Sequence, residues 1–237
     1  MIDLHYWPTP NGWKITILLA ELDVPYQLKY VNIMQGDQFA PAFLTIAPNN
    51  RIPAIVDHHP VDGGKPISLF ESGAIMQYLG DKYGQFYSQD LRTRQQINQW
   101  LFWQMGGLGP MAGQAHHFRQ YAPQTIAYGV DRYTKECNRL YGVMNRHLAE
   151  REYLAGEYSI ADMACWPWAM LNERQGQDIN DFPHVKRWID AIEARPAVRQ
   201  GQQIGLDLRR DITDEESRNI LFGQTASSQE QPKPQDH

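Results

Sequence analysis

The chain has 237 residues, of which 42% are hydrophobic, and a formal net charge of -5 at neutral pH. This length suits one large domain or two modest ones, and the hydrophobic fraction is typical of a protein with a packed core. A negative charge without a long basic run argues against binding to nucleic acid or to an anionic membrane surface. No apolar stretch approaches the roughly 20 residues of a membrane span.

The cysteines and the N-terminus predict a cytoplasmic protein without a bound metal. Cys137 and Cys165 form neither a disulfide framework nor the spacing of zinc ligands, which favours a reducing compartment. The first ten residues lack the basic and apolar regions of a secretory signal. The histidine pairs at 58–59 and 116–117 also lack the spacing of metal ligands on a helix.

Residues 1–86 alternate between strand and helix patterns. Alternating or continuous apolar residues predict strands at 2–6, 27–33, 52–56 and 67–70. Apolar residues at helical spacing predict helices over about 15–22, 41–44 and 72–82. The order predicts a parallel strand pair extended by an antiparallel hairpin, with helices on both faces, which is the thioredoxin-like arrangement.

Strand patterns disappear after residue 92. Helical patterns cover about 92–105, 125–150, 159–171 and 183–195, and Pro196 is expected to end the last of them. We therefore predict a thioredoxin-like domain over 1–86, a linker at 83–91 and an all-helical domain over 92–208. Residues 209–237 form a polar tail whose composition is typical of disorder.

The dipeptide Ile52-Pro53 opens the third predicted strand. If its peptide bond is cis, the N–H and C=O groups of Ile52 are left to pair with an extended peptide, as an added strand would. The alternative is an ordinary trans proline at the start of an edge strand. The dipeptide alone favours this alternative.

The pair Glu71-Ser72 stands where the fourth strand leads into a helix. Free N–H groups and a partial positive charge at a helix N-terminus favour a carboxylate. Ser72 can therefore hold a carboxylate while Glu71 holds an ammonium group, which together recognise an amino-acid head group. The alternative is a plain helix cap with an acidic neighbour.

The turn between the first strand and the first helix spans residues 8–12. Thioredoxin-like proteins carry their reacting thiol here, where the helix dipole favours the thiolate. This turn has no cysteine, which excludes redox chemistry by a protein thiol at this place. The Thr9 hydroxyl and the Asn11 amide can instead donate to a thiolate that a bound cofactor brings in. Turn formation alone also explains proline, asparagine and glycine here.

The helical half carries signals that we interpret as structural. The segment Ser159-Ile160-Ala161-Asp162 is a capping-box pattern ahead of an apolar helix, and Pro167 should bend that helix. Four tryptophans are expected to pack in the core rather than to bind a cofactor, namely Trp100, Trp103, Trp166 and Trp168.

Taken together in their order and spacing, the segments described for both halves of the chain resemble the glutathione transferase superfamily. The matching segments are PTPNGWK, NNRIPAIVD, SLFESGAIMQYL and YSIADMACWPW. Further segments are similar to its Nu class, namely PTPNGWKITILL, GDQFAPAFL and QWLFWQMGGLGPMAGQAHHF. That class is similar to the glutathione disulfide-bond oxidoreductases of bacteria and to the nitrogen-regulatory prion protein of yeast. The resemblance covers about residues 1–200.

The resemblance implies a site for glutathione as cosubstrate, built partly from the first turn. Thr9 and Asn11 would lie beside the glutathione sulfur and act as the catalytic residues. Ile52, ahead of a cis Pro53, would pair with the cysteinyl backbone of the tripeptide. Tyr6 stands near the position at which other classes use a tyrosine to stabilise the thiolate. Here it shares a strand face with apolar residues, so we expect it to pack in the core.

The resemblance also implies residues for the two ends of the tripeptide. Glu71 and Ser72 would hold the γ-glutamyl end, and Gln38 and Arg51 would reach the glycyl carboxylate or neighbouring groups. Arg132 would reach into the site of a partner subunit, which implies a homodimer.

The implied activity is glutathione-dependent disulfide-bond reduction on small-molecule disulfides, with weaker transferase and peroxidase activity. The thiolate of one bound glutathione would attack a disulfide, and a second glutathione would resolve the mixed disulfide. Two alternatives remain open: a transferase that mainly conjugates electrophiles, and a non-catalytic module like the yeast nitrogen regulator. A glutathione-using dehydratase or isomerase also fits the fold.

Overall fold

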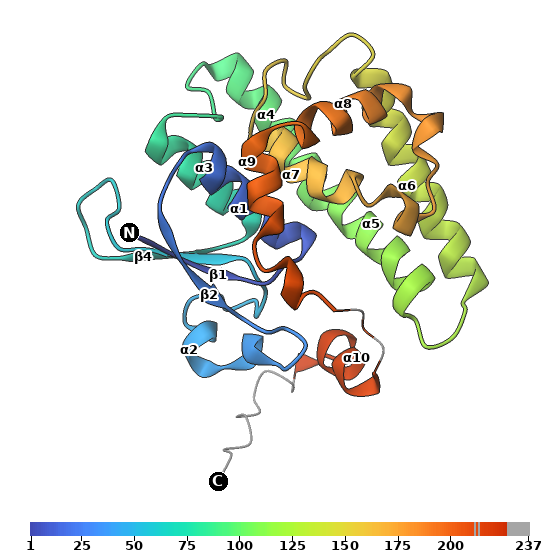
Figure 1. Cartoon of the computed structure of the whole chain (residues 1–237), viewed down its shortest axis with the longest axis horizontal. Coiled ribbons are helices and arrows are strands. Elements are labelled where there is room, and N and C mark those ends of the chain that lie inside the picture. Colours follow the sequence, from blue (N-terminus) through green and yellow to red (C-terminus); the bar gives the residue numbers. More distant parts are fainter. Residues whose placement is uncertain (211, 213, 227–237) are drawn as a thin grey trace.

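The computed structural model describes residues 1–210, 212 and 214–226. A four-stranded sheet with its helices lies beside a bundle of helices (Figure 1). The strands are β1 (Ile2–Tyr6), β2 (Tyr26–Tyr30), β3 (Ala54–Asp57) and β4 (Ile67–Phe70), in the order β2-β1-β3-β4. β1 and β2 are parallel, whereas β3 is antiparallel to both β1 and β4. This is the predicted thioredoxin-like arrangement.

Two helices cover one face of the sheet, and a short one lies on the other (Figure 1). α1 (Pro10–Glu21) and α3 (Ser72–Tyr83) share a hydrophobic core with the inward residues of β1. α2 (Pro41–Leu44) places Phe43 in a separate cluster with Val31 and Ala54. α2 and β4 have the predicted bounds.

The strand β2 ends at Tyr30, three residues earlier than predicted. Side chains that bond to the backbone form a turn there. The carboxylate of Asp37 accepts from the N–H of Asn32 at 2.9 Å, and the Asn32 amide oxygen accepts from the N–H of Met34 at 3.1 Å. Such bonds compete with a strand ladder.

Tyr6 packs in the core, as predicted. Its side chain is fully buried, and its hydroxyl donates to the carbonyl of Ile204 at 2.8 Å. Burial raises the pKa of this hydroxyl well above its ordinary value. The Tyr6 hydroxyl therefore has a structural role, because its hydrogen bond joins β1 to the C-terminal part of the chain.

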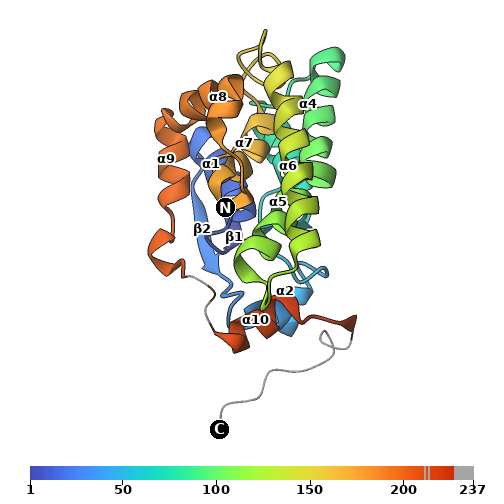
Figure 2. The same ribbon diagram turned by 90° about the vertical axis from the view of Figure 1, so that its right-hand side faces the viewer.

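The bundle contains α4 (Leu91–Trp103), α5 (Gly109–His116), α6 (Ala127–His147), α7 (Ile160–Ala169), α8 (Pro183–Glu193) and α9 (Pro196–Gln203) (Figure 2). The buried helix α7 lies at its centre and begins with the predicted capping box of Ser159 and Asp162. Pro167 lies inside α7. Trp166 is fully buried, while Trp100, Trp103 and Trp168 pack partly buried against the core. None of the described helices has the length and apolar content needed to cross a lipid bilayer.

The helix α5 was not predicted, because Gly106, Gly107, Gly109 and Pro110 look like helix breakers. Wide π-helical turns at Gln104–Leu108 and His117–Tyr121 flank α5. The chain therefore stays helical from α4 onward through both turns. Pro110 falls in the first turn of α5, where a proline costs little.

The helix α9 is a second correction. Pro196 follows the end of α8 as predicted, but it also begins α9, whose first turn tolerates a proline. α9 packs closely on α1, because a Cβ atom on Gly201 would lie 2.6 Å from the backbone nitrogen of Ile17. The Thr16 hydroxyl donates to the Gly201 carbonyl at 2.8 Å. Only glycine permits this approach of the two backbones.

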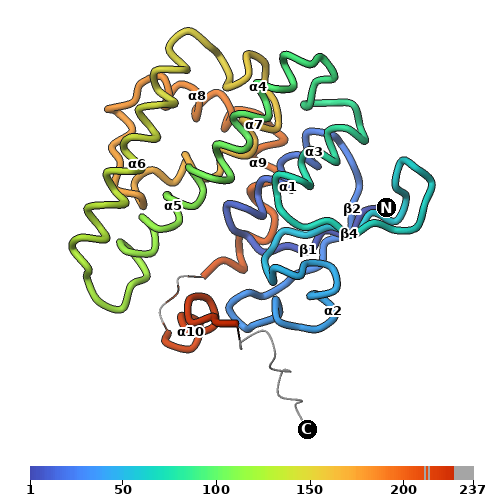
Figure 3. The backbone as a smooth tube through the Cα atoms, turned by 180° about the vertical axis from the view of Figure 1, so that it is seen from behind, coloured from blue at the N-terminus to red at the C-terminus, as the bar shows by residue number. Residues whose placement is uncertain are grey.

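The prediction of disorder after residue 209 is wrong for residues 214–226, which contain α10 (Glu215–Phe222). Asp214 caps this helix by accepting from the N–H of Ser217 at 2.7 Å. α10 lies beside the α2 end of the sheet domain (Figure 3). Phe222 also contacts the rings of His117 and Tyr121 in the bundle. Residues 211, 213 and 227–237, on which the same prediction fell, lie outside the described residues.

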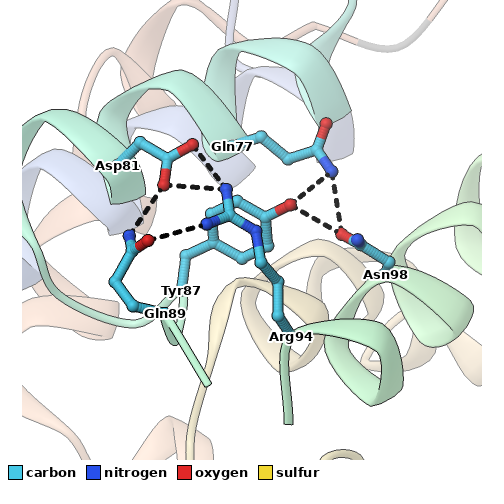
Figure 4. Close-up of polar contacts among 6 residues, drawn as sticks. All are labelled: Gln77, Asp81, Tyr87, Gln89, Arg94 and Asn98. Carbon is cyan, nitrogen blue, oxygen red and sulfur yellow. Dashed lines mark hydrogen bonds and ion pairs between the residues drawn. The ribbon is translucent and has the colours of Figure 1, made fainter. Parts of the chain in front are cut away.

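A polar network fixes the predicted linker between α3 and α4 (Figure 4). Arg94 of α4 binds both carboxylate oxygens of Asp81 of α3, at 2.8 and 2.6 Å, and stacks over the ring of Tyr87. The hydroxyl of Tyr87 donates to Asn98 at 2.8 Å. Gln77 and Gln89 complete the network. The sheet domain and the bundle are thus joined by an ordered connection.

Candidate active site

Two neighbouring cavities lie between the sheet domain and the bundle. The large cavity has a volume of about 430 Å³. Among the described residues it is lined by 7–11, Ile33, Met34, Gln38, 50–52, Gly113, His116, His117, Tyr121, Trp168, Leu171, Arg174, Arg209, Arg210, Ile212, Leu221 and Phe222. The small cavity, of about 350 Å³, is lined by Asn11, Lys14, Glu71, Ser72, Gln104, Met105, Gly109, Pro110, Gly113, Gln114 and Trp168. Asn11, Gly113 and Trp168 line both cavities, so Asn11 lies where they meet.

Thr9 and Asn11 lie at the N-terminus of α1. Thr9 is the N-cap, and its hydroxyl oxygen accepts from the N–H of Gly12 at 3.3 Å. The amide oxygen of Asn11 accepts from the indole N–H of Trp168 at 3.1 Å, which leaves the amide NH₂ as the group that can donate. Position 12 requires glycine, because a Cβ atom would lie 2.3 Å from the carbonyl oxygen of Trp7.

The predicted residues around Ile52 line the large cavity. The Ile52-Pro53 peptide bond is cis, as the resemblance implied, and Ile52 and the exposed Arg51 both face this cavity. Gln38 is buried in its wall and donates to the carbonyl of Ile33 at 3.1 Å. The amide oxygen of Gln38 is buried without a hydrogen-bond partner.

Glu71 and Ser72 line the small cavity. Glu71 precedes α3 with a φ of 68°, a conformation that residues other than glycine rarely adopt, and its exposed carboxylate accepts from the amide of Asn49 at 3.4 Å. Ser72 is the first residue of α3 and is almost fully buried. The structure thus brings both residues to one cavity.

Lys14 was missed by sequence reasoning. Its side chain on α1 is 1% exposed, and its ammonium donates to the amide oxygen of Gln104 at 2.7 Å and to the hydroxyl of Ser72 at 3.3 Å. Burial lowers its pKa to about 7. The sequence did carry a signal that Lys14 faces inward. Lys14 lies one turn after Asn11 and one turn before the buried Leu18, so all three share one face of the helix.

The C-terminal segment is the other part of the site that sequence reasoning missed. Arg209, Arg210 and Phe222 line the large cavity, as do Arg51 and Arg174 from other parts of the chain. His116 is buried in the same wall, and burial lowers its pKa to about 4, so it is neutral at physiological pH. The arginines therefore give this wall a positive charge, to which His116 does not add.

Arg132 is not brought to either cavity of its own chain. It lies exposed on α6, with its guanidinium 3.8 Å from the carboxylate of Glu136. Neither cysteine lines either of these two cavities, and both are fully buried. Burial raises the pKa of Cys137 to about 12 and that of Cys165 well above its ordinary value. In the described part of the chain, no group of three histidine, cysteine or acidic side chains could hold a metal ion.

Comparison with known proteins gives consistent matches over most of the chain. Residues 2–81 match the glutathione S-transferase N-terminal domain, and residues 117–196 match the C-terminal domain. The chain is 54% identical over 218 residues to the disulfide-bond oxidoreductase YfcG of Escherichia coli K12, covering 92% of this chain and 99% of that protein. It is 37% identical to the transcriptional regulator URE2 of Saccharomyces cerevisiae, covering 80% of this chain and 64% of that protein.

A solved structure agrees in sequence and fold. It is a glutathione transferase family member from Pseudomonas fluorescens pf-5 with two glutathione bound, 43% identical, with a TM-score of 0.81 over 85% of this chain and 92% of that chain. Both domain matches, the relatives and the shared fold lead to one conclusion. This chain belongs to the glutathione S-transferase family.

Proposed function

We propose that this chain is a glutathione-dependent disulfide-bond oxidoreductase of the Nu class, in which bound glutathione supplies the reacting thiolate. One observation carries the proposal: Asn11 lies at a helix N-terminus where two cavities meet, and no cysteine lines either cavity. The similarity to YfcG, named a disulfide-bond oxidoreductase, supports the reaction. The two glutathiones of the Pseudomonas fluorescens relative support two tripeptides as reactants.

The tripeptide spans both cavities. Its γ-glutamyl end occupies the small cavity at Glu71 and Ser72, and its cysteinyl backbone pairs with Ile52. The glycyl carboxylate lies toward Arg51 and Gln38, which line the large cavity. This orientation places the sulfur near Asn11, since Asn11 lines both cavities.

The chemistry begins with the glutathione thiol at the N-terminus of α1. Hydrogen bonds from the Asn11 amide and the Thr9 hydroxyl, together with the helix dipole, lower the thiol pKa and favour the thiolate. The thiolate attacks one sulfur of a substrate disulfide, forms a mixed disulfide and expels the other sulfur as a thiolate. The thiolate of a second glutathione attacks the mixed disulfide, yields glutathione disulfide and releases the remaining substrate thiolate.

The large cavity holds the disulfide substrate or the second glutathione. Its arginine wall contrasts with the net charge of -5 of the whole chain. Positive potential concentrated in a cavity attracts anionic small molecules. This charge supports a carboxylate-bearing disulfide as the substrate.

The Cys137→Ala/Cys165→Ala double variant is expected to keep most of the glutathione-dependent reduction of a small disulfide. Both thiols are buried with raised pKa values, so neither supplies a thiolate. The measurement is the steady-state rate with hydroxyethyl disulfide and glutathione, beside a thermal melt that reports folding. A folded double variant without activity would overturn the mechanism.

We also propose a homodimer in which Arg132 of one subunit reaches the site of its partner. Large apolar residues are exposed on the outer strand β4 and on α4, namely Ile67, Phe70, Leu91 and Phe102. A second copy would cover them. Arg132 lines neither cavity of its own chain, so a contribution to a cavity would have to be made in the partner.

Mixed dimers of Asn11→Ala and Arg132→Ala subunits are expected to recover about half of the wild-type rate. If Arg132 acts across the interface, one of the two sites in the mixed dimer has both residues intact, whereas each parent homodimer has none. The mixed dimer is purified through two different N-terminal tags and assayed beside both parents. A mixed dimer no faster than the parents would contradict action across the interface.

A second candidate function is a non-catalytic module, which the 37% identity to the transcriptional regulator URE2 favours. Retention on immobilised glutathione, followed by the disulfide assay, separates the two functions. Conjugation of electrophiles and peroxide reduction would use the same thiolate, and we propose them as weaker activities. A cytoplasmic location stays a prediction from the sequence.

A further inference from the structure

The small cavity has a buried ammonium group in its wall. Lys14 donates to Gln104 and Ser72, and its third contact is the sulfur of Met105 at 3.8 Å. All three partners are neutral. Among the described residues, no carboxylate forms an ion pair with Lys14. A buried charge without an opposite charge is costly, and a ligand anion would relieve that cost.

A second donor in the same wall has no partner. The amide oxygen of Gln104 accepts from Lys14, which fixes the amide so that its NH₂ points away from the ammonium. This NH₂ group is buried without a hydrogen-bond partner. A Cβ atom on Gly109 would lie 2.7 Å from it, so only glycine fits beside the amide. A ligand acceptor in the cavity would satisfy this buried donor.

A helix N-terminus adds to these donors. Ser72 begins the 12-residue helix α3, whose first N–H groups carry partial positive charge. Among the described residues, Glu71 is the only acidic side chain in the wall, and it is exposed at the cavity mouth. The cavity therefore offers cationic and donor groups at its buried end and one carboxylate at its mouth. This polarity fits a zwitterionic amino-acid head group.

We propose that Lys14 is a positioning residue for the α-carboxylate of the γ-glutamyl end of glutathione, acting together with Gln104 and Ser72. This inference rests on the proposed function, since it names the group that sets glutathione in the small cavity. The bound carboxylate neutralises the ammonium of Lys14 and accepts from the NH₂ group of Gln104. Glu71 holds the adjacent ligand ammonium.

This arrangement implies that Lys14 takes up a proton when the ligand binds. Burial lowers the pKa of Lys14 to about 7 in the free protein, and a bound carboxylate raises it again. The ionisable groups that face Lys14 are Glu71 at the start of α3 and Cys165 on α7, and burial keeps Cys165 protonated. The turn carrying Gln104 and Met105 contributes neutral groups. The affinity for glutathione is therefore highest below pH 7 and falls as the pH rises above 7.

Calorimetric titration with S-methylglutathione tests the inference, because this ligand has no thiol to titrate. Between pH 6 and pH 8.5 the affinity of the wild type is expected to fall about tenfold or more. Lys14→Met is expected to bind about tenfold or more weakly at pH 6, with little change toward pH 8.5. Lys29→Met, which removes an exposed lysine of β2 outside both cavities, is the matched control and should follow the wild type.

A ligand without the α-carboxylate distinguishes a direct role from a structural one. For S-methylated 4-aminobutyryl-cysteinyl-glycine, the wild type and Lys14→Met are expected to bind equally, because the group that Lys14 holds is missing. Thermal melts check that Lys14→Met folds. Equal, pH-independent binding of S-methylglutathione by the wild type and Lys14→Met would overturn this inference and leave the proposed function standing. No binding by the wild type at any pH would overturn the proposed function itself.

Discussion

Asn11→Ala is expected to lower the kcat of glutathione-dependent disulfide reduction by about 10- to 100-fold. We propose that the Asn11 amide NH₂ donates to the glutathione sulfur, and a hydrogen bond to a charged group is worth about 1.5–3 kcal/mol. The loss should appear in kcat and in a raised pKa of the bound glutathione thiol. Steady-state kinetics across pH and ultraviolet titration of the bound thiolate measure both.

Trp168→Phe supplies the matched comparison for Asn11→Ala. The indole N–H of Trp168 holds the amide oxygen of Asn11 at 3.1 Å and so keeps the NH₂ group available to the ligand. Without the indole the amide can rotate, and a smaller loss of kcat is expected. Turnover unchanged in Asn11→Ala would remove this residue from the active site.

Asp162→Asn is expected to lower the free energy of unfolding by about 3 kcal/mol. One carboxylate oxygen accepts from the backbone N–H of Leu154 and the indole of Trp188, both at 2.9 Å. The other accepts from the backbone N–H of Ser159 at 3.1 Å and from its hydroxyl at 3.2 Å. An asparagine turns an NH₂ group toward one of these pairs and leaves buried donors without acceptors, at about 1–3 kcal/mol each.

Urea unfolding of Asp162→Asn, followed by tryptophan fluorescence, measures this loss. Burial raises the pKa of Asp162 to about 6, so the wild-type group is still ionised at pH 8, where the comparison is made. Ser159→Ala removes only the capping hydroxyl and should cost about 1 kcal/mol. An Asp162→Asn variant as stable as the wild type would show that the four bonds do not hold α7 in place.

The sequence predicted the sheet domain well because its signals are local. Alternating apolar residues predicted β1, and the turn at residues 8–12 predicted Thr9 and Asn11 as candidate site residues. The strand-to-helix junction likewise predicted Glu71 and Ser72 as candidate binding residues, and the structure brings both to one cavity. In each of these places the short-range pattern and the tertiary structure agree.

The unpredicted parts depend on contacts between distant residues. A lysine looks exposed in a sequence, yet Lys14 is buried because Gln104, 90 positions later, accepts from its ammonium. The glycines and proline before α5 look like breakers, but wide helical turns accommodate them. The polar segment after residue 209 has too few apolar residues to fold alone, and α10 forms where Phe222 meets the rings of His117 and Tyr121.

The position of α10 bears on the size of molecule that the large cavity accepts. α10 supplies Leu221 and Phe222 to one side of the large cavity, and Asn50 donates to Gln224 just after it at 3.2 Å. Because α10 closes this side of the cavity that Asn11 lines, we expect a small disulfide to reach Asn11 more readily than a disulfide within a folded protein.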